Sequence, residues 1–220
     1  TKALVINSPS NPTGNCLNMA TMKQIGVIAE KYDLIVIADD IYTAFSYQNV
    51  FVPFASLPGM KERTITLNSF SKDFTMTGWR VGCIIAPSYI ISTIQQINEN
   101  VVFTAPSISQ RAALCALRKR KEVQPRIVDI YKKRVFYAAE RINGIPKISV
   151  LYPPKGTFYL FINVKEIGGT SEQVTEMMLN KAHVLMLPGN SFGKCGEGYA
   201  RIACTVGQEK LKEAFDRIEN

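Results

Sequence analysis

The sequence is poor in the residues that build metal clusters and in the long apolar runs that cross membranes. It has one histidine, His183, so neither a histidine-rich zinc site nor a Ser-His-Asp triad is expected. Its five cysteines form no Cys-x-x-Cys pair and no metal-ligand spacing, which is typical of reduced thiols. The chain has no apolar run of about eighteen residues and opens with no secretory signal. These absences predict a soluble, cytoplasmic protein with no metal and no membrane partner.

Acidic residues are outnumbered by basic ones, which gives the chain a formal net charge of +8. Much of the excess lies in one stretch, Arg118 to Arg134, with a helical pattern. No aromatic-interleaved basic motif accompanies this stretch, so a solvated helix face is favoured over a nucleic-acid surface. We therefore expect no nucleic-acid partner, while anionic small molecules remain compatible with the charge.

One stretch, residues 69–82, joins two β-type runs through a loop that carries Lys72. An amine that sheds its proton can condense with a carbonyl to form a Schiff base. Ser69 lies three residues before the lysine and Arg80 eight after it, and such donors suit a phosphate group. A lysine taken alone is more often a solvated surface residue, so this interpretation depends on the rest of the chain.

Two other apolar runs, 3–6 and 34–38, flank a helical pattern and predict a β-α-β unit. The carboxyl ends of parallel strands form the edge at which open α/β sheets bind ligands. Asn11 follows the first run, and Asp39 and Tyr42 follow the second. An aspartate at this edge can pair with a protonated pyridine nitrogen.

Simpler interpretations of these polar residues stay open at this point. Asn11 and Pro12 can form an ordinary turn, and Asp39 and Asp40 can be helix N-caps. Asp40 is expected to cap a helix or to face solvent.

The chain from residue 118 onward predicts a second domain of the α+β class with an antiparallel or mixed sheet, after a first domain over residues 1–117. The expected strands are 148–151, 158–164, 183–187 and 199–204, and the expected helices are 122–143, 171–180 and 208–219. Arg201 lies between apolar strand residues and needs a partner. A carboxylate bound in a bidentate manner suits it, and that carboxylate can come from a ligand or from an internal acid.

Together these motifs closely resemble the class I/II aminotransferases, which are pyridoxal-phosphate enzymes of fold type I related to aspartate aminotransferase. The resemblance covers essentially the whole chain but only the later portion of the family's full chain. It makes Lys72 the catalytic lysine that holds the cofactor as an internal aldimine. The cofactor-binding residues that it implies are Asn11, Asp39, Tyr42, Ser69, Lys72 and Arg80.

The resemblance also gives each of these residues a role. Ser69 and Arg80 would hold the phosphate, Asp39 the pyridine nitrogen, and Tyr42 the phenolic oxygen. Asn11 would contact both the phenolic oxygen and the substrate, and Arg201 would clamp the substrate α-carboxylate.

The fold implied by the resemblance is α/β. A part of the three-layer large domain, with a mainly parallel sheet and helices, precedes a smaller α+β domain. The implied function is transamination between an L-amino acid and a 2-oxo acid in a cytoplasmic homodimer, with a cis Asn11–Pro12 bond. We expect a truncated fragment, because part of the family's phosphate cradle lies upstream. Whether the fragment alone is active stays open. A β-lyase of the same fold and a non-catalytic sensor domain of a transcription regulator stay as alternatives, and the amino-acid substrate stays open.

Overall fold

The computed structural model describes residues 1–219, and they divide into two compact units. The first unit comprises Thr1–Pro9 and Cys16–Val128, and the second comprises Ser10–Asn15 and the chain from Asp129 onward. The expected boundary at 118 coincides with the junction of two helices, α4 (Ser107–Arg118) and α5 (Arg120–Gly144). The boundary between the two compact units lies within α5, after Val128.

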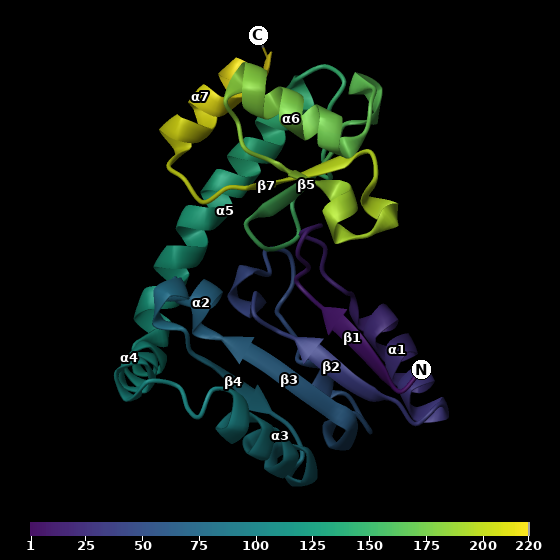
Figure 1. The fold of residues 1–220 in the computed structure, drawn as a ribbon, viewed down its shortest axis with the longest axis vertical. Coiled ribbons are helices and arrows are strands. Elements are labelled where there is room, and N and C mark those ends of the chain that lie inside the picture. The colour runs from purple at the N-terminus through teal and green to yellow at the C-terminus, as the bar shows by residue number, and fades with distance from the viewer. Residues whose placement is uncertain (220) are drawn as a thin grey trace. The chain divides into compact units, whose positions relative to one another are not determined.

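A four-stranded sheet forms the centre of the first unit, with the strands in the order β1-β2-β3-β4 (Figure 1). The strands are β1 (Ala3–Asn7), β2 (Ile35–Asp39), β3 (Thr64–Ser69) and β4 (Gly82–Ile85). The first three are parallel, and β4 runs antiparallel to β3. Asn7 pairs with Asp39, and Ser69 pairs with Gly82. The mainly parallel sheet predicted from the apolar runs is therefore confirmed.

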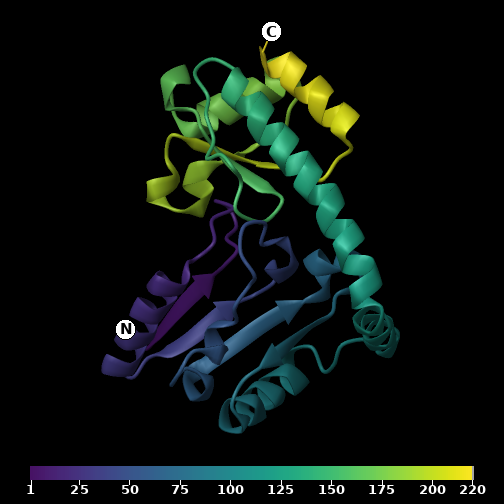
Figure 2. The ribbon, with the colours of Figure 1, turned by 180° about the vertical axis from the view of Figure 1, so that it is seen from behind.

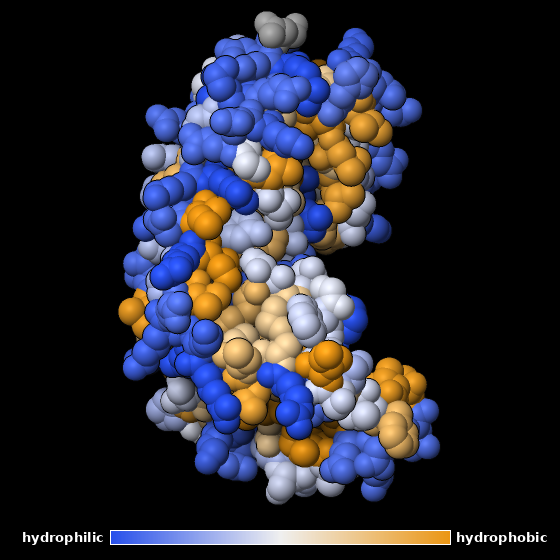
Figure 3. Space-filling view, turned by 90° about the vertical axis from the view of Figure 1, so that its left-hand side faces the viewer, coloured by the Kyte–Doolittle hydropathy of each residue, from blue (hydrophilic) through white to orange (hydrophobic). Residues whose placement is uncertain are grey.

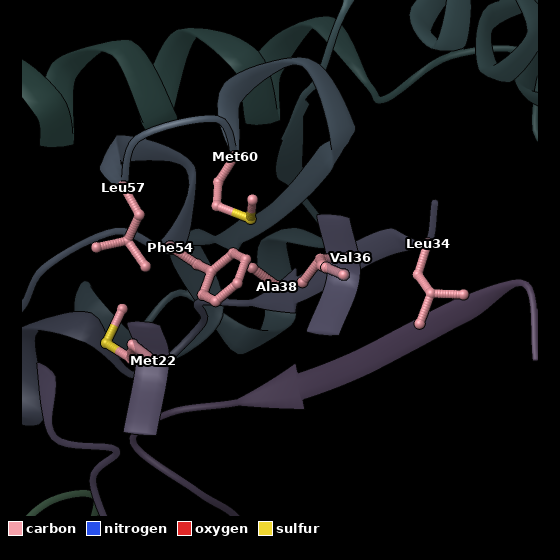
Figure 4. Close-up of a cluster of buried hydrophobic side chains, with 8 residues drawn as sticks. Met22, Leu34, Val36, Ala38, Phe54, Leu57 and Met60 are labelled. Carbon is pink, nitrogen blue, oxygen red and sulfur yellow. The ribbon is translucent and has the colours of Figure 1, made fainter. Parts of the chain in front are cut away.

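Helix α1 (Met19–Lys31) connects β1 to β2 and packs against the sheet. It begins at Asn18, whose side chain accepts a hydrogen bond of 2.8 Å from the N–H of Thr21, as an N-cap does. A buried apolar cluster then joins this helix to β2 and to the segment before β3 (Figure 4). Its members are Met22, Ala29, Leu34, Val36, Ala38, Phe54, Leu57 and Met60. This packing fixes β2, and with it the polar residues at its end.

The remaining helices of the first unit are α2 (Phe70–Asp73), α3 (Ser88–Val101) and α4. Phe70 and Phe74 pack with Met76, Val81 and Ala113 in a second apolar cluster, which joins α2 to α4. The two phenylalanine rings are stacked, with 5.4 Å between their centroids. The basic residues Arg118–Lys121 at the junction of α4 and α5 are exposed. Figure 3 shows many hydrophilic residues on the face that it draws, with hydrophobic patches among them.

The second unit has a three-stranded antiparallel sheet in the order β5-β7-β6. Its elements are β5 (Tyr159–Asn163), α6 (Ser171–Ala182), β6 (Leu187–Pro188), β7 (Tyr199–Ala203) and α7 (Gln208–Glu219). Figures 1 and 2 show α6 and α7 on the same side of this sheet as the C-terminal half of α5. The predicted α+β class with an antiparallel sheet is confirmed for this unit.

Two predicted strands of the second unit are wrong in extent. Residues 148–151 contribute only one bridge, between Ser149 and Asn163, instead of a strand. The predicted strand 183–187 is reduced to β6, because His183 ends α6 in the left-handed conformation with φ of 54° and so cannot start a strand. Among residues 1–219, no helix is long and apolar enough to cross a membrane.

Candidate active site

Lys72 lies in α2, directly after the carboxyl end of the parallel strand β3. The change from strand to helix occurs at Ser69, which has extended dihedral angles and accepts a hydrogen bond of 3.1 Å from the N–H of Ser71. The predicted loop is thus a single helical turn. Lys72 is half-buried, and no ion pair in the described chain involves it. The structure therefore presents its amine at the ligand-binding edge of the sheet.

The neighbours of Lys72 in α2 are anchored on the opposite side of the helix. Phe70, Asp73 and Phe74 are buried, with at most 9% of each residue exposed. At 3.6 residues per turn, positions 70, 73 and 74 share one face and position 72 lies opposite. This arrangement leaves the lysine on the face that packs against neither cluster.

Asp39 ends β2 at the same edge of the sheet. Its carbonyl oxygen accepts a hydrogen bond of 2.9 Å from Nδ2 of Asn7, and in the register of the sheet it pairs with Leu67 of β3. The side chain is half-buried. Burial raises the pKa of its carboxyl group, and a hydrogen bond from the N–H of Ile41 partly offsets this. A cation beside Asp39 would therefore stabilise its charged form.

Asp40 was expected to cap a helix or to face solvent, and this is wrong. Only 4% of the residue is exposed. Its N–H donates to the carbonyl oxygen of Leu67 at 2.9 Å, so it continues the extended strand and faces the side opposite to Asp39. Burial, and secondly the charge of Asp39, raise the pKa of Asp40 to about 7. It lines a cavity of about 300 Å³ together with Ile6, Met22 and Phe54.

Tyr42 follows these acids and is 2% exposed. It immediately precedes a short 3-10 helix, η1 (Thr43–Phe45). Asp73 of α2 holds this turn, because its Oδ2 accepts hydrogen bonds from Oγ1 of Thr43 at 2.7 Å and from the N–H of Ala44 at 3.2 Å. No local sequence pattern indicates this contact, because its partners are separated by about thirty residues.

Arg80 lies two residues before Gly82, the residue that pairs with Ser69 when β4 pairs with β3. Ser69 pairs with Gly82, and the N–H of Phe70 donates to the carbonyl oxygen of Val81 at 3.3 Å. Arg80 has a left-handed φ of 51°, is exposed, and donates from Nη1 to the carbonyl oxygen of Thr77 at 2.8 Å. The first unit thus brings Ser69, Lys72 and Arg80 to one end of the β3–β4 pair.

The second unit holds the other two predicted residues, Asn11 and Arg201, together. Nη1 of Arg201 donates to Oδ1 of Asn11 at 2.9 Å. The guanidinium carbon lies 4.4 Å from the ring centroid of Tyr159 and 5.0 Å from that of Phe192. No ion pair within residues 1–219 involves Arg201, so the alternative of an internal acidic partner does not apply. The Asn11–Pro12 bond is cis, as predicted.

Three residues that contact the predicted site residues or neighbour them were not identified from the sequence. Tyr159 provides a ring for Arg201, and the only signal for it was its place in the aromatic-rich segment 158–161. Phe192 ends the short 3-10 helix η6 (Gly189–Phe192), and no role was predicted for it. Asp73 follows Lys72 directly, and no sequence pattern indicated a role for it. Among the described residues, no group of histidine, cysteine and acidic side chains can hold a metal ion.

The two sets of side chains support different chemistry. The first unit offers a primary amine, a carboxylate, a phenol and a guanidinium group at one sheet edge, which is a set of partners for an anionic aromatic carbonyl compound. The second unit offers a guanidinium group with no acidic partner within residues 1–219, which suits a carboxylate.

Comparison with known proteins agrees with this chemistry. Residues 1–218 match the family model for aminotransferase class I and II. The whole chain is 43% identical to the aspartate aminotransferase of Pyrococcus abyssi and 39% identical to aromatic-amino-acid aminotransferase 2 of Thermococcus litoralis, and it covers 57% of each. The crystal structure of the aromatic aminotransferase from Pyrococcus horikoshii matches the whole chain at 40% identity with a TM-score of 0.96, and the chain covers 59% of it. The chain thus spans little more than half the length of these relatives.

Proposed function

This chain belongs to the aminotransferase class I and II family and has the aspartate-aminotransferase-like fold. We therefore propose that it acts as a pyridoxal-phosphate-dependent aminotransferase. The reaction moves an amino group between an L-amino acid and a 2-oxo acid. One observation carries this proposal. The half-buried residue Lys72 lies at the sheet edge that ends in Asp39 and Ser69, and its amine has no ion pair within the described residues.

The residues of the first unit fit the cofactor. When bound, the cofactor supplies an aldehyde that reacts with the lysine amine and a ring that takes up the electron pair released at the substrate carbon. Asp39 suits the positively charged ring nitrogen, because that charge opposes the effect of burial on its pKa. Ser69 and Arg80 suit the phosphate, and Tyr42 suits the phenolic oxygen. The contact of Asn11 with the cofactor stays a prediction from the resemblance.

Lys72 has two tasks in this proposal. Its amine holds the cofactor before substrate arrives. Once released, the same amine would take the proton from the substrate α-carbon as a general base and deliver it, as a general acid, to the cofactor carbon that carried the aldehyde.

Arg201 binds the α-carboxylate with its planar fork of donors, while Asn11 and the two rings hold the guanidinium group in place. Fixing the carboxylate orients the C–H bond that is to be broken.

Amino acids and 2-oxo acids are the proposed substrates. The relatives described above are named for aspartate and for aromatic amino acids, so the side-chain preference stays open. A homodimer and a cytoplasmic location also remain predictions. The names of these relatives favour an aminotransferase over the β-lyase and the sensor domain.

Transfer of labelled nitrogen tests the function directly. The chain is incubated with pyridoxal phosphate, an amino acid carrying isotopically labelled nitrogen and an unlabelled 2-oxo acid, with aspartate and phenylalanine tried in turn. We expect the label in the amino acid formed from the 2-oxo acid, and no transfer by a Lys72→Ala variant. A β-lyase needs a leaving group on the β-carbon, so a labelled S-alkyl cysteine is tried in parallel. Release of labelled ammonia from it without transfer would indicate the lyase, and the absence of both reactions would contradict catalysis by this chain.

A further inference from the structure

Asp73 follows Lys72 directly, and the proposed chemistry does not use it. Only 3% of the residue is exposed, although aspartate is rarely fully buried unless its charge is paired. Within residues 1–219, Asp40 is the only other buried acidic residue. A buried carboxylate is stable only where other donors replace the water that it loses.

Those donors come from the turn that follows β2. One oxygen of Asp73, Oδ2, accepts from Oγ1 of Thr43 at 2.7 Å and from the N–H of Ala44 at 3.2 Å. Both partners belong to η1, which begins immediately after Tyr42. A single carboxylate oxygen therefore connects the helix that carries Lys72 to the turn that carries Tyr42.

Helix α2 needs such a connection because it is only four residues long. This is little more than one turn, and a helix of that length does not persist without tertiary contacts. The stacked rings of Phe70 and Phe74 provide an apolar anchor, and Asp73 provides a polar anchor on the same face. Lys72 projects from the opposite face, so both anchors together determine where its amine lies.

We propose that Asp73 is a positioning residue for Lys72, whose buried carboxylate ties α2 to the turn after Tyr42 and so sets the place of the lysine amine at the sheet edge. This inference rests on the proposed function, since the position of the amine matters for catalysis only if Lys72 holds the cofactor. Asp73 acts through α2 and makes no contact with the reacting atoms.

The tie depends on an acceptor at position 73 more than on a charge. Burial raises the pKa of Asp73 to about 6, while the hydrogen bonds from Thr43 and Ala44 lower it. The other oxygen, Oδ1, is buried and has no hydrogen-bond partner. An asparagine can place its one carbonyl oxygen at the position of Oδ2 and accept both bonds, whereas an alanine can accept neither.

Two measurements on the full chain test the proposal, using Asp73→Ala, Asp73→Asn and, as a control for the loss of an acid, Asp129→Ala. Amide hydrogen exchange followed by mass spectrometry reports on peptides that contain η1 and α2. Borohydride trapping with pyridoxal phosphate, followed by peptide mapping, gives the trapping rate at Lys72, with the exposed Lys194 as an internal reference.

We expect Asp73→Ala to speed exchange in both peptides and to slow trapping at Lys72 by about tenfold or more, because a misplacement of about 1 Å can cost on the order of a hundredfold in rate. Trapping at Lys194 should not change, and Asp73→Asn should largely restore the wild-type values. Unchanged hydrogen exchange in Asp73→Ala would contradict the proposed connection between α2 and the turn after Tyr42. Faster exchange with unchanged trapping at Lys72 would reduce Asp73 to a purely structural role and so overturn the proposal. A wild-type chain that gives no adduct at Lys72 contradicts the proposed function instead, and exchange then still decides whether the tie exists.

Discussion

The Arg201 guanidinium group receives its support from neutral groups. Asn11 accepts one hydrogen bond from it, and the rings of Tyr159 and Phe192 lie within 5.0 Å of its central carbon. Its Nε atom is buried and has no hydrogen-bond partner. An arginine held in this way keeps its full charge for an incoming carboxylate, because no internal acid within residues 1–219 competes for it.

Replacing one ring should weaken carboxylate binding without changing the charge. Phe192→Leu removes a cation–π contact worth about 1 kcal/mol, so the Kd for a dicarboxylate such as maleate should rise by roughly fivefold. Isothermal titration calorimetry measures the change, and Phe192→Tyr, which keeps a ring, serves as the control. Equal affinity in the leucine variant and the wild type would show that the ring does not support Arg201.

Asp40 predicts how stability depends on pH. Its pKa is raised from 3.8 to about 7, so the folded chain retains a proton that the unfolded chain has released. The stabilisation associated with this proton is complete below about pH 4 and is lost as the pH rises through about 7. A tenfold difference in proton affinity corresponds to about 1.4 kcal/mol, so the full effect is on the order of 2 to 4 kcal/mol.

The variant Asp40→Asn removes this titration. The free energy of unfolding of this variant, compared with that of the wild type, should be more favourable at about pH 8 than at about pH 4.5. At pH 8 the wild type buries a charged carboxylate, whereas the variant does not. Urea unfolding at both values gives the difference in the free energy of unfolding. Asp129→Asn, on an exposed part of α5, should show little of this dependence. A difference between Asp40→Asn and wild type that does not change with pH would contradict the account.

The pairing of β3 with β4 brings Ser69 and Arg80 to one end of the sheet, and it depends on a close approach at Gly82. A Cβ atom built on Gly82 would lie 2.7 Å from the carbonyl oxygen of Asn68, a distance that real Cβ atoms essentially never show. Because the obstacle is backbone, no side chain can move aside. The glycine thus permits the antiparallel strand that follows the Lys72 segment.

Gly82→Ala should therefore destabilise the first unit by about 1 to 3 kcal/mol through steric overlap. Thermal unfolding measured by circular dichroism detects the change. The matched control is Gly78→Ala, because a Cβ atom at Gly78 meets nothing within 4 Å and its φ is not left-handed. If both alanine variants lowered stability equally, the close approach at Gly82 would not be the cause.

The elements that the sequence predicted well are those whose pattern is local. The apolar runs before Asp39 and Ser69 became parallel strands. The predicted strand 183–187 is longer than the observed β6, because His183 terminates α6. The burial of Asp40 and the bonds of Asp73 to the turn after Tyr42 could not be predicted, since both depend on partners distant in sequence.

The chain as a whole comprises two units, and the candidate residues are distributed between them. The first unit holds Asp39, Tyr42, Ser69, Lys72 and Arg80, and the second holds Asn11 and Arg201. The assignment of Asn11 to the second unit could not be predicted from its position in the loop that follows β1. The short segment Ser10–Asn15 packs there, where Gly14 lies against the backbone of Gly156 and Tyr159.

Covalent attachment of the cofactor to one lysine is the claim on which the proposed function depends. The chain and a Lys72→Ala variant are mixed with pyridoxal phosphate, reduced with borohydride, digested and mapped by mass spectrometry, after circular dichroism has shown that both are folded. The account predicts one dominant adduct, on Lys72, that is lost in the variant while minor adducts on exposed lysines remain. An adduct pattern that is the same in both proteins would contradict it.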